Sequence, residues 1–427
     1  MMRSRRIVPI QMVYAVSPTG VVIMGDSLMY VVLPVAAIEF GVHEQLGLAA
    51  SFWIGLALSI NRFIRLVSNS FAAFVCQRLG VRWPFVVSIA AGALSTLAYG
   101  LGSGVAALLL ARAVWGVSYS FMRLAAHLTA FGVGTSDMRG RMMGLFNSGQ
   151  RFGSFVAVTA GAMLFHLTSR EVTFTALAVV GLLGVLIATR IPNLRPERVR
   201  SSVEGFRDRL NAWDLAISRL PGYGRKLRLP LLSISLMRFA TAFGANGLAI
   251  ATLAPYLAGF ADDSDRVLDG AFAVVTLAGL LVGFRWLSEI SLGVAMGYLS
   301  DRVGRRMFIA CGMAVMVASL AMMVAFDSVV AVVVAIPVLF VAAVGVNTAL
   351  DAAIGETSTT STRAAVLGRY STWLDLGAAL GPFAGFLIAD RIGFNGGFLV
   401  AAVLLAGTWT FYVAATGDPR RQHRRQQ

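Results

Sequence analysis

Long apolar runs of roughly twenty residues, separated by short polar stretches, dominate the chain. A membrane core of about 30 Å needs about 20 apolar residues in helical form, so each run is long enough to cross a bilayer. The runs lack the two-residue alternation of barrel strands, which indicates helices. Twelve segments are predicted: Ile10–Ile38, Leu46–Val75, Pro84–Gly102, Val105–Ala130, Arg141–His166, Thr173–Ile191, Pro230–Ala258, Ala271–Leu299, Met307–Phe326, Ser328–Leu350, Ala364–Ala389 and Phe394–Ala415.

One long polar stretch separates the first six segments from the last six. We expect an N-terminal six-helix half at 1–191, a cytoplasmic linker at 192–229, a C-terminal six-helix half at 230–416 and a basic cytoplasmic tail at 417–427. The linker is too short for a domain. The predicted fold class is an all-α membrane protein with twelve transmembrane helices in two pseudo-symmetric halves.

Composition excludes several other classes. The 427 residues are 57% hydrophobic and 13% charged, with a mean hydropathy of +0.75. Soluble domains carry about 25% charged residues, so a soluble enzyme, a disordered chain and a disulfide-stapled secreted domain are excluded. The net charge is +15, and Lys226 is the only lysine among 36 basic residues, which leaves 36 − 1 = 35 arginines.

The basic residues predict the orientation of the chain in the membrane. With the N-terminus inside, about 24 basic residues fall in cytoplasmic loops and termini. Only Arg170, Arg266 and Arg391 fall outside. Both termini are therefore expected to be cytoplasmic, and the positive charge sets topology rather than indicating a nucleic-acid partner.

Two distant helix pairs repeat with the same offset of 224 residues. The matched positions are Arg78/Arg302, Gly80/Gly304 and Arg82/Arg306 near the second and eighth segments, and Arg139/Arg363, Gly144/Gly368, Gly153/Gly377 and Gly161/Gly385 in the fifth and eleventh. One offset that serves both pairs predicts two homologous halves, with substrate bound near the midplane between them.

A charged loop motif follows the eighth segment. The residues Gly297-Tyr-Leu-Ser-Asp301-Arg302-Val-Gly304-Arg305-Arg306 fit the signature G-x-x-x-D-R-x-G-R-R, and the chain resembles the major facilitator superfamily. The resemblance implies a cytoplasmic loop that gates the conformational change. Asp301 is expected to meet the positive N-terminal end of a neighbouring helix, while the arginines cap helix C-termini. The copy of this motif in the first half carries Gln77 instead of the aspartate, so the motif is degraded there and an equivalent gating contact is in doubt.

Two further motifs match the family less closely. Arg112, in Leu110-Ala-Arg112-Ala-Val-Trp-Gly116, resembles a buried arginine motif that is often linked to proton coupling. A glycine-rich motif, similar to one in drug–proton antiporters, lies in the eleventh segment. In antiporters the corresponding motif belongs to the fifth segment. Its helix-packing residues are Gly368, Gly377, Gly381, Pro382 and Gly385.

Ionisable residues within the segments are costly, at about 2.5–3.5 kcal/mol each, so each needs a partner or a water-filled cavity. The repeat offset maps Arg65 onto Glu289 and Arg151 onto Asp375. Each of the four lies 12 positions from a cytoplasmic landmark, or about 18 Å along a helix. From the helix neighbours of the resembled family we predict two gating pairs, Arg65–Asp375 and Arg151–Glu289. In the alternative, Glu289 pairs with Arg285 on its own helix.

Asp26 lies near the middle of the first segment. It is interpreted as a protonation or substrate site, or alternatively as the structural partner of Arg112 or Arg123. Once the three acids are paired, arginines remain for the substrate cavity, and guanidinium groups favour carboxylate or phosphate ligands. The residues predicted for the substrate and proton cavity are Asp26, Arg62, Arg112, Arg123, Arg238 and Arg285, with Asn61, Asn69, Asn147, Gln150, Asn246 and Asn347 as further polar candidates.

These features predict secondary active transport of a small molecule by alternating access. The sequence has no G-x-x-x-x-G-K-[ST] loop, so the energy is expected from an ion gradient, with protons carried by Asp26 or by Glu289 and Asp375. The arginine surplus favours an organic anion or a metal–anion complex. The alternatives are a drug/proton antiporter that exports hydrophobic compounds, and a non-transporting scaffold or receptor derived from a transporter.

Catalytic and metal-binding motifs are not found. Paired metal ligands and a nucleophile–base motif are both missing from the sequence, so no enzyme, cofactor or metal site is expected. The expected partners are membrane lipid, a small-molecule substrate and protons. We expect a monomer in a bacterial inner membrane or a compartment derived from it.

Overall fold

The structure is a computed structural model that describes residues 10–133, 139–194, 225–261, 270–326, 328–357 and 363–416. In these ranges the elements are helices, and the one β-type feature is an isolated bridge between Gln45 and Leu48. Ten of the described helices are long and apolar enough to cross a membrane. The predicted basic tail and most of the predicted linker lie outside the described residues.

The chain forms two compact units. Unit 1 comprises Met1–Leu210 and Arg266–Ile290, and unit 2 comprises Asn211–Asp265 and Ser291–Gln427. The boundary falls inside helix α11, whose first part belongs to unit 1 and whose second part belongs to unit 2. The predicted halves at 1–191 and 230–416 stay a prediction.

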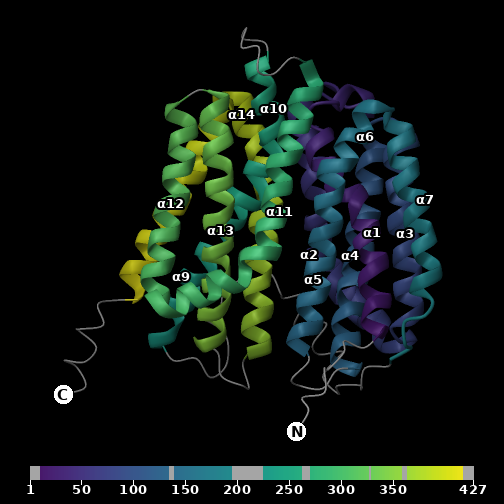
Figure 1. Ribbon diagram of the computed structural model, residues 1–427, viewed down its shortest axis with the longest axis horizontal. Coiled ribbons are helices and arrows are strands. Elements are labelled where there is room, and N and C mark those ends of the chain that lie inside the picture. Colours follow the sequence, from purple (N-terminus) through teal and green to yellow (C-terminus); the bar gives the residue numbers. More distant parts are fainter. Residues whose placement is uncertain are drawn as a thin grey trace. The chain divides into compact units, whose positions relative to one another are not determined.

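The helices of unit 1 pack mainly on helices that are distant from them in the sequence. Helix α1 lies against α5 and α7, α3 lies against α4 and α7, and α2 lies against α4 (Figure 1). The elements are α1 Ile10–Val32, the 3₁₀ helix η1 Ala37–Phe40, α2 Ala50–Leu79, α3 Arg82–Leu101, α4 Val105–Val133, α5 Arg139–Val156, the π-helical η2 Ala157–Gly161, α6 Ala162–Leu167 and α7 Arg170–Ala188.

Unit 2 is built around the long helix α14. This helix packs against α9 and the π-helical segment that follows it, and it also contacts α12, which in turn packs on α13 (Figure 1). The elements are α9 Arg225–Thr241, the π-helical η5 Ala242–Leu248, α10 Ala249–Ala261, α12 Arg305–Ala325, α13 Val329–Thr357 and α14 Arg363–Thr416. Helix α11 spans Gly270–Val303 and belongs to both units.

Several predicted helix boundaries shift for local reasons. Helix α1 ends at Val32 and not at Ile38, because Pro34 lacks an N–H and disfavours helical geometry in the residue before it. Helix α2 begins at Ala50 and not at Leu46, because Leu46 and Gly47 adopt positive φ angles of 55° and 71° in a turn. Helix α9 begins five residues before the predicted Pro230, which lies inside it.

Two features explain why ten helices are counted where twelve segments were predicted. Helix α14 counts once, although non-helical φ/ψ angles at Ile392 and Gly393 break it where the eleventh and twelfth segments were predicted to part. The fifth segment is absent from the ten. Helix α5 carries Arg139, Arg141 and Arg151, and the π-helical η2 separates it from the six-residue α6.

Glycines allow the first helix of each unit to approach another helix at backbone distance. A Cβ atom on Gly153 of α5 would lie 1.9 Å from the carbonyl oxygen of Gly20 on α1. In unit 2, a Cβ on Gly377 of α14 would lie 2.3 Å from the carbonyl oxygen of Phe239 on α9. Gly153 and Gly377 match under the repeat offset, so equivalent glycines make the equivalent crossing within each unit.

The other residues of the glycine-rich motif extend this crossing in unit 2. A Cβ on Gly381 would lie 2.6 Å from the Cα of Gly247, and one on Gly385 would lie 3.1 Å from the side chain of Thr252. Pro382 borders the same contact, since its ring lies 3.0 Å from a Cβ built on Gly247. Gly368 belongs to α14, but its surroundings lie outside the described residues.

We predict that Gly153→Ala destabilises the protein by about 1–3 kcal/mol, because the added methyl group forces α1 and α5 apart. The matched control is Gly144→Ala on the same helix, where an added Cβ meets nothing within 4 Å. Thermal unfolding of the purified protein in detergent measures both. Equal unfolding midpoints for the two variants would contradict the crossing.

Candidate functional site

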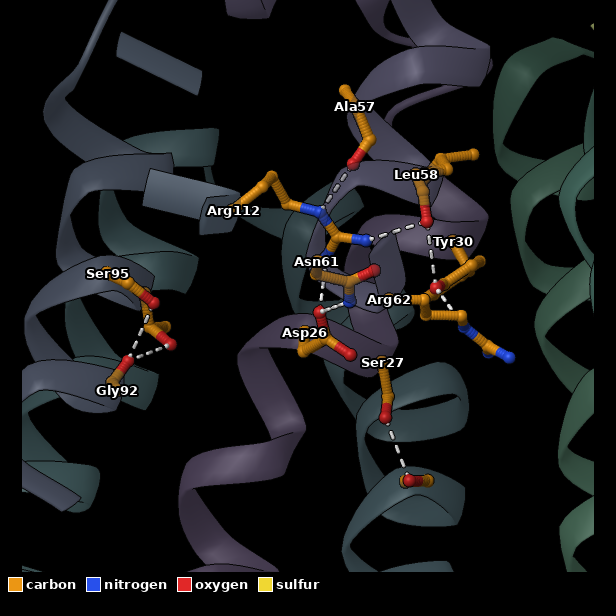
Figure 2. A network of polar contacts seen from close by, with 12 residues as sticks. Asp26, Ser27, Tyr30, Ala57, Leu58, Asn61, Arg62, Gly92, Ser95 and Arg112 are labelled. Atoms are coloured by element: carbon orange, nitrogen blue, oxygen red, sulfur yellow. Dashed lines mark hydrogen bonds and ion pairs between the residues drawn. The ribbon is translucent and has the colours of Figure 1, made fainter. Parts of the chain in front are cut away.

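Arg112 on α4 is completely buried, and its guanidinium is held by oxygens of α1 and α2. It forms an ion pair with the Asp26 carboxylate on α1. Its Nε donates to the carbonyl oxygen of Ala57 at 2.8 Å, and its Nη2 donates to that of Leu58 at 3.3 Å (Figure 2). The buried charge is therefore compensated by one carboxylate and two backbone carbonyls.

Small residues and polar neighbours complete this network. A Cβ on Gly116 would lie 2.4 Å from the carbonyl oxygen of Asn61, so glycine lets α4 approach α2. Asn61 donates through Nδ2 to Asp26 Oδ1 at 3.0 Å, and Arg62 donates through Nε to the Tyr30 hydroxyl at 3.2 Å (Figure 2). The network joins α1, α2 and α4 within unit 1.

The environment of Asp26 favours one of the two roles that the sequence left open. Its side chain is 13% exposed, and both Arg112 and Asn61 donate to the same oxygen, Oδ1. Removing one partner of a buried ion pair costs about 3–5 kcal/mol, since it leaves an uncompensated charge. Asp26 thus acts first as the counterion of Arg112, and its part in proton movement stays a prediction.

A second charged cluster in unit 1 centres on Glu289 of α11. Arg151 on α5 forms an ion pair with Oε2, and Arg285, one turn earlier on α11, lies 2.8 Å from Oε1. The predicted Arg151–Glu289 contact is therefore present, and so is the alternative contact within α11. The guanidinium of Arg285 also lies over the ring of Trp286, 4.1 Å from its centroid.

A third contact chain in unit 1 links α2, α4 and α5. The guanidinium of Arg65 lies 4.9 Å from the centroid of the Tyr119 ring, and the Tyr119 hydroxyl donates to Gln150 Oε1 at 2.9 Å. Gln150 directly precedes Arg151 in the sequence. Tyr119 was not among the predicted residues, because a tyrosine in a span is not distinguishable from a packing residue by sequence alone.

Unit 2 contains an ion pair that sequence analysis missed. Arg238 on α9 lies 3.7 Å from the carboxylate of Asp351 on α13, and the Tyr370 hydroxyl donates to that carboxylate at 2.7 Å. The predicted tenth segment ended at Leu350, whereas α13 continues to Thr357 and includes Asp351. The repeat offset of 224 residues could have drawn attention to Asp351, since it aligns this position with another titratable residue, His127, in the first half.

The predicted surplus of arginines is smaller than expected. Arg112, Arg238 and Arg285 each contact a carboxylate. The acid that pairs with Arg238 is Asp351, which was not among the three acids predicted within the spans. Arg123 lies half-buried on α4, and its carbonyl oxygen is 2.6 Å from His127 Nδ1. Asp375 is buried in α14. The predicted Arg65–Asp375 pair would join the two units and stays a prediction.

The charged loop after α11 turns through Gly304, whose φ of +93° favours glycine. Arg305 at the start of α12 donates to Asp301 at 3.1 Å and lies 2.8 Å from Glu356 on α13. Asp301 is thus paired with the guanidinium four residues later, and the expectation that it meets a helix N-terminus stays a prediction. Gly297 packs near Thr348, and Arg302 lies over the ring of Tyr298.

Capping of helix C-termini by the loop arginines is found in both units. Arg306 donates to the carbonyl oxygen of Val413 near the end of α14, at 3.5 Å. Its repeat equivalent Arg82 donates to the carbonyl oxygen of Ile191, just after α7, at 2.7 Å. The last arginine of each loop, Arg82 or Arg306, therefore ties the loop to the last helix of its own unit.

Metal and cofactor ligands do not converge in the part of the chain that the structure describes. No three His, Cys, Asp or Glu side chains gather there in a group that could hold a metal ion. The side chains that meet in the contacts described above therefore carry guanidinium, carboxylate, amide and phenol groups. Such groups bind ions and exchange protons.

Comparison with known proteins identifies one family. A sequence model described as "Major Facilitator Superfamily" matches residues 19–288 and 234–427. The human synaptic vesicular amine transporter is 28% identical over 148 residues, which are 34% of this chain and 28% of that protein. The chain thus covers less than a third of the length of this relative.

Solved structures share the fold across nearly the whole chain. The nucleoside transporter NupG aligns with a TM-score of 0.74 at 13% identity, covering 96% of this chain and 99% of NupG. The human organic anion transporter MFSD10 aligns with a TM-score of 0.68 at 15% identity, covering 95% of this chain and all of MFSD10 (100%). At these identities the likeness establishes the fold.

We predict that Asp26→Leu lowers stability by about 3–5 kcal/mol, because Arg112 then carries an uncompensated charge in an apolar core. The double variant Asp26→Leu/Arg112→Leu should regain most of this loss, since no charge stays buried. Unfolding midpoints in detergent, followed by tryptophan fluorescence, measure both. A double variant as unstable as Asp26→Leu alone would show that Asp26 does not act as the counterion.

Proposed function

Because the chain belongs to the major facilitator superfamily, we propose that it is a secondary active transporter that moves a small molecule by alternating access. It is an integral multi-pass membrane protein. Its proposed location is a bacterial inner membrane, with both termini on the cytoplasmic side where the loop arginines lie. Energy comes from an ion gradient, and we propose protons as the coupling ion.

The charge of the unit 1 helices carries the proposal for the substrate. Two carboxylates, Asp26 and Glu289, lie within the described spans of this unit away from the helix ends. The guanidiniums there outnumber them: Arg62, Arg65, Arg112, Arg123, Arg151 and Arg285. Even with each carboxylate engaged, the unit keeps a positive excess. That excess supports an organic anion or a metal–anion complex as substrate.

The two predicted gating pairs belong to this proposal. In one access state Arg151–Glu289 and Arg65–Asp375 form, and in the other they separate. The shared carboxylate of Glu289 supports such a role, because Arg285 on the same helix keeps a contact with it when Arg151 leaves. The carboxylate is then never without a cation.

A drug/proton antiporter that exports hydrophobic compounds is the second candidate. Asp26 on α1 favours it, since its carboxylate is partly exposed and could carry a proton or contact a cationic amine. The local similarity to the vesicular amine transporter, over 148 residues, supports the same candidate. A third candidate, a scaffold without transport, would have no flux.

Reconstitution into proteoliposomes tests these candidates. We predict that an inward proton gradient drives uptake of radiolabelled organic anions such as benzoate or citrate, and that a protonophore abolishes it. Protonated amines such as dopamine should not exchange for protons. Amine–proton exchange without anion uptake would favour the antiporter, and no flux under any gradient would favour the scaffold.

A further inference from the structure

A cleft opens in unit 1 where α6 meets α7 (Figure 1). It has a volume of about 410 Å³, and its walls come from the segment after α1, the corner between α6 and α7, and the first part of α11. Its lining includes the apolar side chains of Val35, Phe165 and Val275 and the charged side chains of Glu39, Arg170 and Glu171. The cleft therefore offers both signs of charge next to an apolar surface.

Arg170, the first residue of α7, supplies a fixed positive charge in the wall of this cleft. Its side chain is 9% exposed, and its Nη1 donates to the carbonyl oxygen of Gly102 at 3.0 Å. Its Nη2 lies 3.3 Å from a carboxylate oxygen of Glu171, and the guanidinium lies 5.3 Å from the centroid of the Phe40 ring. A guanidinium has five N–H donors, so these contacts leave capacity for a further acceptor.

Two carboxylates in the same lining supply negative charge. Glu39 is exposed, and its carboxylate has no hydrogen bond or ion pair with the described residues. Glu171 is 53% exposed and shares its charge with Arg170. The third titratable residue of the lining, His166, is exposed and has a contact of its own. The carboxylate in excess favours a cationic group in the cleft, while Arg170 offers a nearby place for an anionic one.

An apolar groove begins at the carboxylate of Glu171. It has a volume of about 570 Å³, and the residues that line it with Glu171 recur along one face of α7: Val172, Thr175, Ala176, Val179 and Val180. The buried face of the helix carries Phe174, Ala178 and Gly181 instead. Because Glu171 lines both the cleft and the groove, one molecule with a charged head and a long apolar chain can occupy the two together.

We propose that the cleft and the groove bind a phospholipid with a primary ammonium headgroup, of the phosphatidylethanolamine type. The ammonium group lies at Glu39 and Glu171, the phosphate at Arg170, and one acyl chain along the exposed face of α7. A primary ammonium donates charge-assisted hydrogen bonds to carboxylates, whereas a choline headgroup has no N–H to donate. The inference goes beyond the proposed function and does not depend on which molecule is transported.

The position of the site along α7 fits a lipid headgroup. Helix α7 has 19 residues, which span about 28 Å, close to the membrane core of about 30 Å. Glu171 lies in its first turn, and the contact between Arg82 and Ile191 lies beyond its other end. The headgroup site therefore belongs to the leaflet opposite the one that meets the loop arginines.

Native mass spectrometry of the purified full chain in detergent tests the inference. The protein is titrated separately with dioleoyl phosphatidylethanolamine, with dioleoyl phosphatidylcholine, and with phosphoethanolamine, which is the headgroup without chains. We expect the ethanolamine lipid to bind about fivefold more tightly than the choline lipid, as befits an ion pair at the membrane surface. Phosphoethanolamine should give no adduct at the same concentrations, because it lacks the chain that fills the groove.

Three variants separate the headgroup from the chain. Glu39→Gln keeps the shape of the side chain but removes its charge, so the two lipids should then bind about equally. Glu44→Gln is the matched control, at an exposed carboxylate that follows η1 but does not line the cleft, and it should keep the fivefold preference. Ala176→Trp fills the groove and should weaken both lipids by a similar factor while their ratio stays near five.

The outcomes decide between this lipid and other occupants. Equal binding of the two lipids by the wild type, or a preference that Glu39→Gln retains, would overturn the inference. Phosphoethanolamine that binds as tightly as the whole lipid would also overturn it, since the occupant would then be a soluble amine. If Glu39→Gln does not fold, Glu171→Gln replaces it with the same expected loss of preference.

Discussion

A guanidinium inside an apolar helix is stable only where oxygen atoms compensate its charge, and this requirement organises the structure. Arg112 illustrates it most fully, since its completely buried side chain meets a carboxylate and two backbone carbonyls from two other helices. Isolated charges of this kind would destabilise a span by several kcal/mol. The compensating contacts therefore tie α1, α2 and α4 together and decide which faces of these helices meet.

Glycines supply the geometry that such contacts need. The carbonyl of Asn61 lies where a side chain at Gly116 would be, and Asn61 itself holds Asp26. Close approaches at Gly153 in unit 1 and at Gly377 in unit 2 repeat the same crossing. The polar contacts do not repeat in this way: the repeat offset places Ile250 at the position of Asp26 and Ile336 at that of Arg112. Thus the packing is duplicated, whereas the charges have diverged.

The three carboxylate–guanidinium clusters differ in the surroundings of their carboxylates. Asp26 and Arg112 cancel within a network that is nearly closed. Arg238 and Asp351 also cancel, but the Asp351 side chain is 56% exposed. Around Glu289, one carboxylate contacts guanidiniums from two helices, α5 and α11.

The sequence by itself determined the class of the protein, the places where most helices begin and end, and the internal repeat, because these depend on local hydropathy, prolines, glycines and spacing. It also singled out Asp26, Arg112, Arg151 and Glu289, since charged residues are conspicuous in apolar runs. Only the tertiary structure decided that Arg112 holds Asp26, that Arg238 pairs with Asp351, and that Glu289 is shared by two arginines. Pairing between distant helices depends on which faces meet and how closely glycines let them approach, and neither quantity is encoded in the local pattern of one segment.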